Sequence, residues 1–484
     1  MYQISDVKKF VKCPKLFQLE YFGKSKIERS YLNICDDLNE LLRKKLKIEN
    51  YLLEHVSPNI PLTKDDISNY KWTIDGHFKY EQLNVKIPFI KKQTNGYDIY
   101  FLKLATYPKK DDYLRYLISY YVLLKNNIKV NNVKIIYLNS KYYRDKAIDV
   151  DNLFKVSKHF YENEKTKGKS ISYSLRVKTN INKLLNGMNA INSDTVIEEI
   201  HPTKCNSRVK CSHLDTCTTT SYPDDSILTL RDYRQKKNDI SEDVVYLKDI
   251  DLNIFNCNQK QFAQIKASKN NGEYYDNSHL TSFIKKYQNK PVVFIDFEWD
   301  TYVIPPYKKM KVFDSLPFQY SMHIIDQNDN IIHKEFLGIK DCRMSFITSF
   351  INDLPKDTPI FAFNAQGGEI IRLKDLSRQF KKYSKELEDI IDRIVDLSYI
   401  FSDGYYYNIK MRGAYSLKAI SKAITDIDYD IEVCNGVEAV IHHRLYEKTN
   451  GQDLILKEQL LNYCKLDTLV LLKIYKYLEK LIIK

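Results

Sequence analysis

The segment Pro291-Val-Val-Phe-Ile-Asp-Phe-Glu298 joins an apolar run to two acids, Asp296 and Glu298. An apolar run of this length is typical of a buried β-strand. Because side chains alternate across a strand, Asp296 and Glu298 point to one face and Phe297 points into the opposite layer. Two adjacent carboxylates repel each other unless hard cations such as Mg²⁺ lie between them. The alternative is a strand end that reaches solvent and carries two hydrated acids.

A second pair of polar residues lies at a predicted strand-to-helix junction. Residues 359–376 predict a buried strand, a Gly-Gly turn and a helix that opens with Glu369. Asn364 and Glu369 therefore fall where α/β proteins place their functional sites.

The C-terminal segment supplies a third pair. Residues 458–479 predict an amphipathic helix, and Tyr463 and Asp467 lie four residues apart on one of its faces. This spacing puts a candidate metal ligand beside a phenol that can orient water.

Taken together, these pairs resemble the three motifs of DEDDy exonucleases, the DnaQ-like branch of the ribonuclease H fold: Asp296-x-Glu298, Asn364…Glu369 and Tyr463-x-x-x-Asp467. The chain also resembles a bacterial family that joins a RecB-like nuclease domain to a DnaQ-like exonuclease domain. The matching stretches are Pro317-Phe-Gln-Tyr-Ser321, His333-Lys-Glu-Phe-Leu337, Arg393-Ile-Val-Asp-Leu397, Tyr415-Ser-Leu-Lys418, Asn435-Gly436 and Tyr463-Cys-Lys-Leu-Asp-Thr468. The second motif usually holds Asp; here the candidate is Glu369, with Asp375 as its rival.

The resemblance implies a metal-dependent 3′–5′ exonuclease that acts on single-stranded DNA or RNA by two-metal phosphodiester hydrolysis. In that reading two Mg²⁺ or Mn²⁺ ions are held by four acids: Asp296, Glu298, Glu369 and Asp467. Tyr463 orients the attacking water, and Asn364 and Lys418 contact the substrate. Asp396 is either a support for the site or a structural turn acid.

The resemblance also implies an α/β fold with two domains. We expect a RecB-like, restriction-endonuclease-type domain over residues 1–225 and a connecting region over 226–284. A ribonuclease H-like (DnaQ-like) exonuclease domain is expected over 285–484. Residues 72–80, 83–90, 97–105 and 133–138 predict strands, with a turn at Asn95-Gly96, and residues 112–126 predict a helix, an order compatible with the first fold. The order predicted for the second is strand 291–298, an antiparallel pair around residues 326–330, strand 359–364, helix 369–380, strand 393–397, a helical stretch around 416–424 and the final helix.

The RecB-like domain is predicted to be catalytically degenerate. Its fold needs an Asp, a Glu-x-Lys pair and often a Gln, and the corresponding positions hold Pro88, Phe101-Leu-Lys103 and Ser119. Only Lys103 matches, so no acids remain to hold magnesium. In another register, Glu81 and Asp98 would be the available acids.

Three cysteines with spacings of five residues, Cys205, Cys211 and Cys217, follow this domain. With Cys13 they resemble the one-plus-three arrangement of RecB-like nucleases that bind an iron–sulfur cluster. The resemblance implies a 4Fe–4S cluster bound by the four cysteines. The alternative is a Zn²⁺ ion, for which His213 could replace one thiolate ligand. A third interpretation is that the four cysteines are unrelated thiols that bind no metal together.

Charge is divided unevenly along the chain. Residues 1–290 hold 49 Lys and Arg against 34 Asp and Glu, a net charge of +15, whereas residues 291–484 hold 26 against 28, a net charge of −2. A basic N-terminal part favours nucleic acid as the partner, although a basic surface also serves solubility alone. No apolar stretch approaches the ~18 residues of a membrane span. The N-terminus lacks a signal core, so a cytoplasmic location without membrane association is expected.

A function from another class is also compatible with the sequence. In it, both domains are relics of nucleases, and the protein is a non-catalytic nucleic-acid-binding or scaffold protein. The substituted positions of the first domain favour the interpretation that this domain is a relic. The four acids and the tyrosine of the second domain argue against the same interpretation for that domain.

Overall fold

The computed structural model divides into two units, each of which combines helices with β-sheets, so the chain is mixed α/β as predicted. Unit 1 comprises Met1–Glu28, Ile34–Glu199 and Tyr302–Phe313; unit 2 comprises Arg29–Asn33, Ile200–Thr301 and Asp314–Lys484. The structure describes residues 1–23, 32–34, 37–49, 52–54, 60–176, 180–197, 211, 213, 217, 223–232, 244–270, 272–427, 429, 431, 433 and 435–483.

Among its described residues, unit 1 contains a six-stranded sheet in the order β2-β3-β4-β5-β6-β7. The β2–β3 and β5–β6 pairs are parallel and the others antiparallel. Gly96, in the predicted β4–β5 turn, has φ +111°, which glycine adopts at little cost. A separate hairpin pairs β8 with β9. The strands are β2 (Leu52–Glu54), β3 (Trp72–Tyr80), β4 (Leu83–Gln93), β5 (Gly96–Leu102), β6 (Val130–Leu138), β7 (Phe154–Ser157), β8 (His159–Tyr161) and β9 (Lys167–Ser170).

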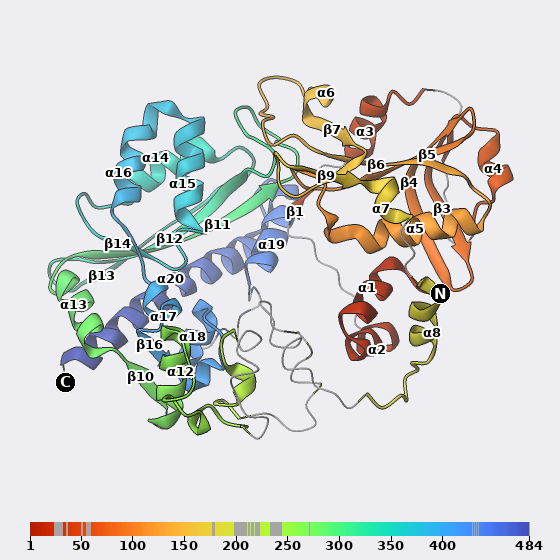
Figure 1. Cartoon of the computed structure of the whole chain (residues 1–484). Helices are drawn as coiled ribbons and strands as arrows, with labels where there is room; N and C mark the ends of the chain where they lie inside the picture. Colours follow the sequence, from red (N-terminus) through yellow and green to blue (C-terminus); the bar gives the residue numbers. More distant parts are fainter. Residues whose placement is uncertain are drawn as a thin grey trace. The chain divides into compact units, whose positions relative to one another are not determined.

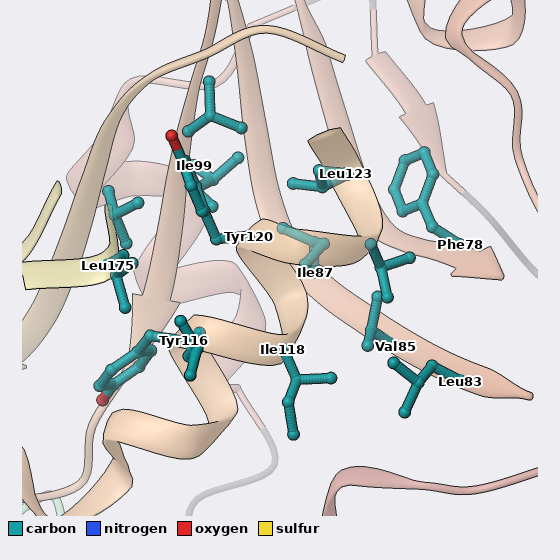
Figure 2. Close-up of a cluster of buried hydrophobic side chains, with 14 of the residues drawn as sticks. Phe78, Leu83, Val85, Ile87, Ile99, Tyr116, Ile118, Tyr120, Leu123 and Leu175 are labelled. Atoms are coloured by element: carbon teal, nitrogen blue, oxygen red, sulfur yellow. The ribbon is translucent and has the colours of Figure 1, made fainter. Parts of the chain in front are cut away.

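The core of unit 1 forms where helix α5 covers the sheet. Figure 2 shows Ile118 and Leu123 of this helix gathered with Val85, Ile87 and Ile99 of the neighbouring strands. Each of these side chains is almost fully buried, so the hydrophobic effect holds helix and sheet together. The helices are α1 (Ile4–Lys12), α2 (Pro14–Phe22), α3 (Leu38–Leu46), α4 (Lys64–Ser68), α5 (Tyr113–Lys125), α6 (Val150–Leu153), α7 (Ile171–Leu175) and α8 (Ile181–Asn189).

The main sheet of unit 2 has the order β13-β12-β11-β14-β15, with short strand β1 also paired to β11. Strands β13, β12 and β11 are mutually antiparallel, whereas β14 and β15 run parallel to β11. A smaller sheet pairs β10 with β16. The strands are β1 (Leu32–Asn33), β10 (Glu273–Tyr275), β11 (Val292–Tyr302), β12 (Ser315–Ile325), β13 (Ile331–Leu337), β14 (Ile360–Ala362), β15 (Ile394–Asp396) and β16 (Tyr406–Asn408).

Helices cover both faces of this sheet, as Figure 1 shows: α14, α15 and α16 lie on one face and the long helix α20 runs along the other. Successive side chains of β11 pack alternately against the helices on one face of the sheet and those on the other. Phe294 packs in the cluster with α20, whereas Ile295 and Phe297 pack in the cluster with α14 and α15. The helices are α12 (Gln259–Lys269), α13 (Asn277–Tyr287), α14 (Arg343–Asp353), α15 (Glu369–Gln379), α16 (Ser384–Asp392), α17 (Tyr399–Ser402), α18 (Leu417–Ile424), α19 (Gly436–Lys448) and α20 (Leu454–Ile483).

The region expected to connect two domains, residues 226–284, contains α12, β10 and most of α13 and groups with unit 2. Strand β10 pairs with β16, which follows the main sheet in sequence. None of the described helices is both long enough and apolar enough to cross a membrane.

Candidate active site

Asp296 and Glu298 project from β11 toward the side of the sheet on which α20 lies. Their neighbour Phe297 is buried on the opposite side against α14, as the alternation of the strand predicts. Glu298 is 8% exposed and Asp296 is half-buried. One carboxylate oxygen from each, together with one from Asp467 of α20, lies within 4.8 Å of the others. The structure therefore brings the first and third predicted acid motifs together.

Two tyrosine hydroxyls donate hydrogen bonds to Asp467. The Tyr429 hydroxyl lies 2.6 Å from Asp467 Oδ1, and Tyr463, one turn earlier on α20, also donates to this carboxylate. Burial raises the pKa of both phenols, so both remain protonated donors at neutral pH. Sequence reasoning identified Tyr463 from its helical spacing but missed Tyr429. The signal that could have found it is the strict alternation of acidic and apolar residues from Asp426 to Val433, in which Tyr429 holds an apolar position.

Glu369 opens α15 and is 2% exposed. The turn that precedes it is built by Asn364, whose φ is +56° and whose carbonyl accepts hydrogen bonds from Gly367 and Gly368 at 2.9 and 3.0 Å. Asp396 of β15 accepts the Asn364 N–H at 2.9 Å. Asp396 therefore has the structural turn role, and it fixes the junction from which Glu369 projects.

The second-motif alternative, Asp375, lies farther along α15 and makes an ion pair of 3.0 Å with Arg378. Glu369, by contrast, lines the same cavity as Asp296, Glu298 and Asp467. The structure thus places Glu369, and not Asp375, with the other acids.

The cavity has a volume of about 560 Å³, within the ~300–1,000 Å³ typical of ligand pockets. Lys418, at the start of α18, lines it and places its Nζ 4.7 Å from the centre of the Tyr429 ring and 5.6 Å from that of Tyr463. Asn364 lines it as well, so both predicted substrate contacts lie in the pocket. The remaining lining residues are Phe297, Trp299, Thr301, Phe363, Gly367, Gly368, Ser416, Leu417, Asn435, Gly436, Val437, Val440 and Tyr463.

The acids of the cavity resist ionisation in the absence of cations. Burial, followed by repulsion from Asp467, raises the pKa of Asp296 and Glu298 well above the usual range. Burial raises the pKa of Glu369 to about 7. It raises the pKa of Asp467 to about 6, against the lowering effect of the two tyrosine hydroxyls and Lys418. The charge of Lys418 also opposes the rise in the pKa of Glu298.

The donor set fits hard divalent cations. Three carboxylate oxygens converge within 4.8 Å, and the Oε2 atom of Glu369 is buried without a hydrogen-bond partner among the described residues. A buried carboxylate oxygen without a donor is costly unless a cation approaches it. Asp296, Glu298, Glu369 and Asp467 would therefore hold Mg²⁺ or Mn²⁺, which prefer oxygen ligands.

Two of the four positions predicted for the RecB-like site, Pro88 and Lys103, lie together in unit 1. Pro88 of β4 and Lys103 line a second cavity of about 530 Å³, and Phe101 is fully buried against Tyr116. Lys103 makes ion pairs of 2.6 and 3.0 Å with Asp112 and Asp111. The alternative acids lie elsewhere: Asp98 pairs with Lys134 at 2.7 Å, and Glu81 occupies the β3–β4 turn.

The four-cysteine site stays a prediction. Cys13 lies in unit 1 between α1 and α2, whereas Cys211 and Cys217 belong to unit 2. Cys205 lies outside the described residues. His213 is described, and its main-chain carbonyl accepts a hydrogen bond of 2.9 Å from the Cys217 N–H.

Residues 293–416 are similar to a family described as a domain of unknown function, DUF2779. The matched segment contains Asp296, Glu298, Asn364 and Glu369 and stops before Lys418 and the third motif on α20. No curated protein matches the chain. No solved structure matches it either.

Proposed function

We propose that this protein is a metal-dependent 3′–5′ exonuclease that hydrolyses single-stranded DNA or RNA in unit 2. The observation that carries the proposal is the convergence of Asp296, Glu298, Glu369 and Asp467, from three separate elements, on one cavity that also contains Tyr463. The mixed sheet, with three antiparallel strands followed by two parallel ones, supports a ribonuclease H-like (DnaQ-like) fold.

Each functional side chain of the cavity has its own role in phosphodiester hydrolysis. Divalent ions held by Asp296, Glu298, Glu369 and Asp467 would supply activation of water and neutralisation of the charge on the attacked phosphate. Tyr463, protonated and hydrogen-bonded to Asp467, orients the attacking water by accepting a hydrogen bond through its phenol oxygen. Lys418 supplies the positive charge that attracts a phosphate group. Asn364 contacts the substrate.

Unit 1 supports a role in binding. We propose that it is a RecB-like domain that holds nucleic acid without cutting it, because Pro88 and Phe101 stand where that fold needs acids and Lys103 is neutralised by aspartates. Residues 1–290, which contain most of unit 1 and the first part of unit 2, carry a net charge of +15, and this charge favours a nucleic-acid partner.

The experiment that tests the hydrolytic site compares Asp296→Ala and Asp467→Ala with Glu458→Ala, which removes an exposed acid from the same helix α20. Purified proteins are incubated with 5′-labelled single-stranded DNA and RNA in Mn²⁺, Mg²⁺ or EDTA. We expect stepwise shortening from the 3′ end with the parent and Glu458→Ala, and none with the two site variants or in EDTA.

If both site variants shorten the labelled strands as fast as the parent, Asp296 and Asp467 are not residues of the hydrolytic site. If the parent cuts no substrate in Mn²⁺ yet binds single strands, the non-catalytic binding or scaffold protein becomes the better description. That second candidate is supported by Pro88 and Phe101, which stand where a RecB-like domain would carry acids.

A further inference from the structure

Trp299 follows Glu298 directly on β11, and a register shift separates the two residues. Glu298 pairs with Gln319 of β12, whereas Trp299 pairs with Pro317, so one residue of β12 is left over. In a regular strand, Trp299 would share the buried face of Phe297. Trp299 keeps this face, because it packs on the cluster around Phe297, and like Phe297 it also lines the cavity.

One face of the Trp299 indole is already covered. The guanidinium of Arg372, on α15, lies 4.0 Å from the ring centre. Arg372 is fixed by hydrogen bonds to the carbonyls of Gly367 and Gly368 at 2.9 and 3.3 Å. Of these described residues, Trp299 lines the cavity and Arg372 does not, so the covered face is turned away from the cavity.

The same cavity is lined by an aromatic ring and aliphatic side chains besides its acids. A Cβ added at Gly368 would lie 3.7 Å from Trp299 Cη2, in ordinary van der Waals contact. Phe363, Leu417 and Val440 also line the cavity. The cavity therefore combines the candidate cation ligands with an aromatic surface, the indole of Trp299.

We propose that this surface is a nucleobase subsite, in which Trp299 stacks on the base of the nucleotide whose phosphate lies at the acid cluster. Stacking on an aromatic face accepts every base, because each base offers a π-face. Arg372 is a positioning residue that holds the indole from behind through a cation–π contact. The inference rests on the proposed function for the identity of its ligand.

The sequence offers a direct probe of this subsite because it contains only two tryptophans, Trp72 and Trp299. Trp72 is buried in unit 1, so the Trp72→Phe protein reports fluorescence from Trp299 alone. We would titrate that protein with AMP and, separately, with ribose 5-phosphate, in Ca²⁺. We expect saturable quenching by AMP and none by ribose 5-phosphate. Equal responses to both would overturn the inference.

A second measurement uses substitutions of Trp299 in the otherwise natural chain. Calorimetry should show AMP binding weakened about 5- to 100-fold by Trp299→Ala and little by Trp299→Phe, which keeps an aromatic face. In the strand-shortening assay, Trp299→Ala should raise KM more than it lowers kcat. Unchanged AMP affinity in Trp299→Ala would refute the subsite even if the parent hydrolyses nucleic acid. Base-dependent quenching without any hydrolysis would support the subsite and reject the proposed exonuclease.

Discussion

The carboxylate of Asp467 shows how single contacts control the candidate site. It lies 7% exposed among other acids, and two phenol hydroxyls and Lys418 oppose the rise in its pKa. Hydrogen bonds to an ionised carboxylate are stronger than those between neutral groups. The tyrosines therefore keep a metal ligand ionised in a place where burial and its neighbours disfavour charge.

Tyr429→Phe tests this role. Loss of the 2.6 Å hydrogen bond should raise the pKa of Asp467 further and weaken Mn²⁺ binding roughly 10-fold, as expected for a hydrogen bond to a charged group. Isothermal calorimetry with Mn²⁺ measures the affinity. Tyr246→Phe, at an exposed tyrosine of unit 2, is the matched control. Identical Mn²⁺ affinity in Tyr429→Phe and the parent would show that the hydroxyl does not support the ligand.

The raised pKa values of the acids predict how stability depends on pH. A carboxyl group whose folded-state pKa lies above its unfolded value binds more protons when folded, so the free energy of unfolding falls as pH rises from about 4 to about 7. Bound cations reverse this loss because they favour the ionised forms. We expect saturating Mn²⁺ to raise Tm more at pH 8 than at pH 5, by about 2–4 °C for each kcal/mol recovered.

Differential scanning calorimetry at the two pH values measures this effect. The Asp296→Asn, Asp467→Asn double variant should lose most of the increase in Tm and should be less destabilised by high pH than the parent. An increase in the parent that is equal at both pH values would contradict the assignment of these acids as cation ligands.

At the scale of elements, α19 forms one wall of the cavity through Gly436, Val437 and Val440. An ion pair fastens this helix to β11: the Arg444 guanidinium donates to both carboxylate oxygens of Asp300 at 2.9 and 2.7 Å, and Asp300 is 0% exposed. The end of the strand that carries the acids is thus joined to the helix opposite them.

Arg444→Met should destabilise unit 2 by roughly 3–5 kcal/mol, because it leaves a buried carboxylate without its partner. Asp300→Asn in the same background should restore part of that loss, because it removes the uncompensated charge. Urea denaturation followed by circular dichroism measures both variants. A loss below ~1 kcal/mol in Arg444→Met would show that the pair behaves like an exposed surface ion pair.

At the scale of the whole molecule, hydrolysis and binding are proposed for different units. Lys103→Ala in unit 1 should leave strand shortening unchanged, because the aspartates beside Lys103 already neutralise it and the expected metal ligands are missing at Pro88 and Phe101. The same labelled-strand assay checks this outcome. Loss of cleavage in Lys103→Ala, with folding and binding intact, would place catalysis in unit 1.

The sequence by itself determined the mixed α/β class, strands β3 to β6 and helix α5 of unit 1, strands β11 to β15 and helices α15, α18 and α20 of unit 2, and the shared orientation of Asp296 and Glu298. These features follow from local periodicity: a strand repeats every two residues and a helix every 3.6, so four-residue spacing was enough to pair Tyr463 with Asp467. Asn95–Gly96 was also readable, because glycine alone favours that backbone conformation.

Only the tertiary structure decided which residues from different elements meet. Tyr429 reaches Asp467 across 38 positions of sequence, and the alternation of residues 426–433 does not say which carboxylate its hydroxyl meets. The choice of Glu369 over Asp375 depended on which turn of α15 faces the cavity, and the register shift beside Trp299 could not be read from the sequence of β11. Such contacts are fixed by packing between elements and by strand register, which a periodic pattern along one segment does not encode.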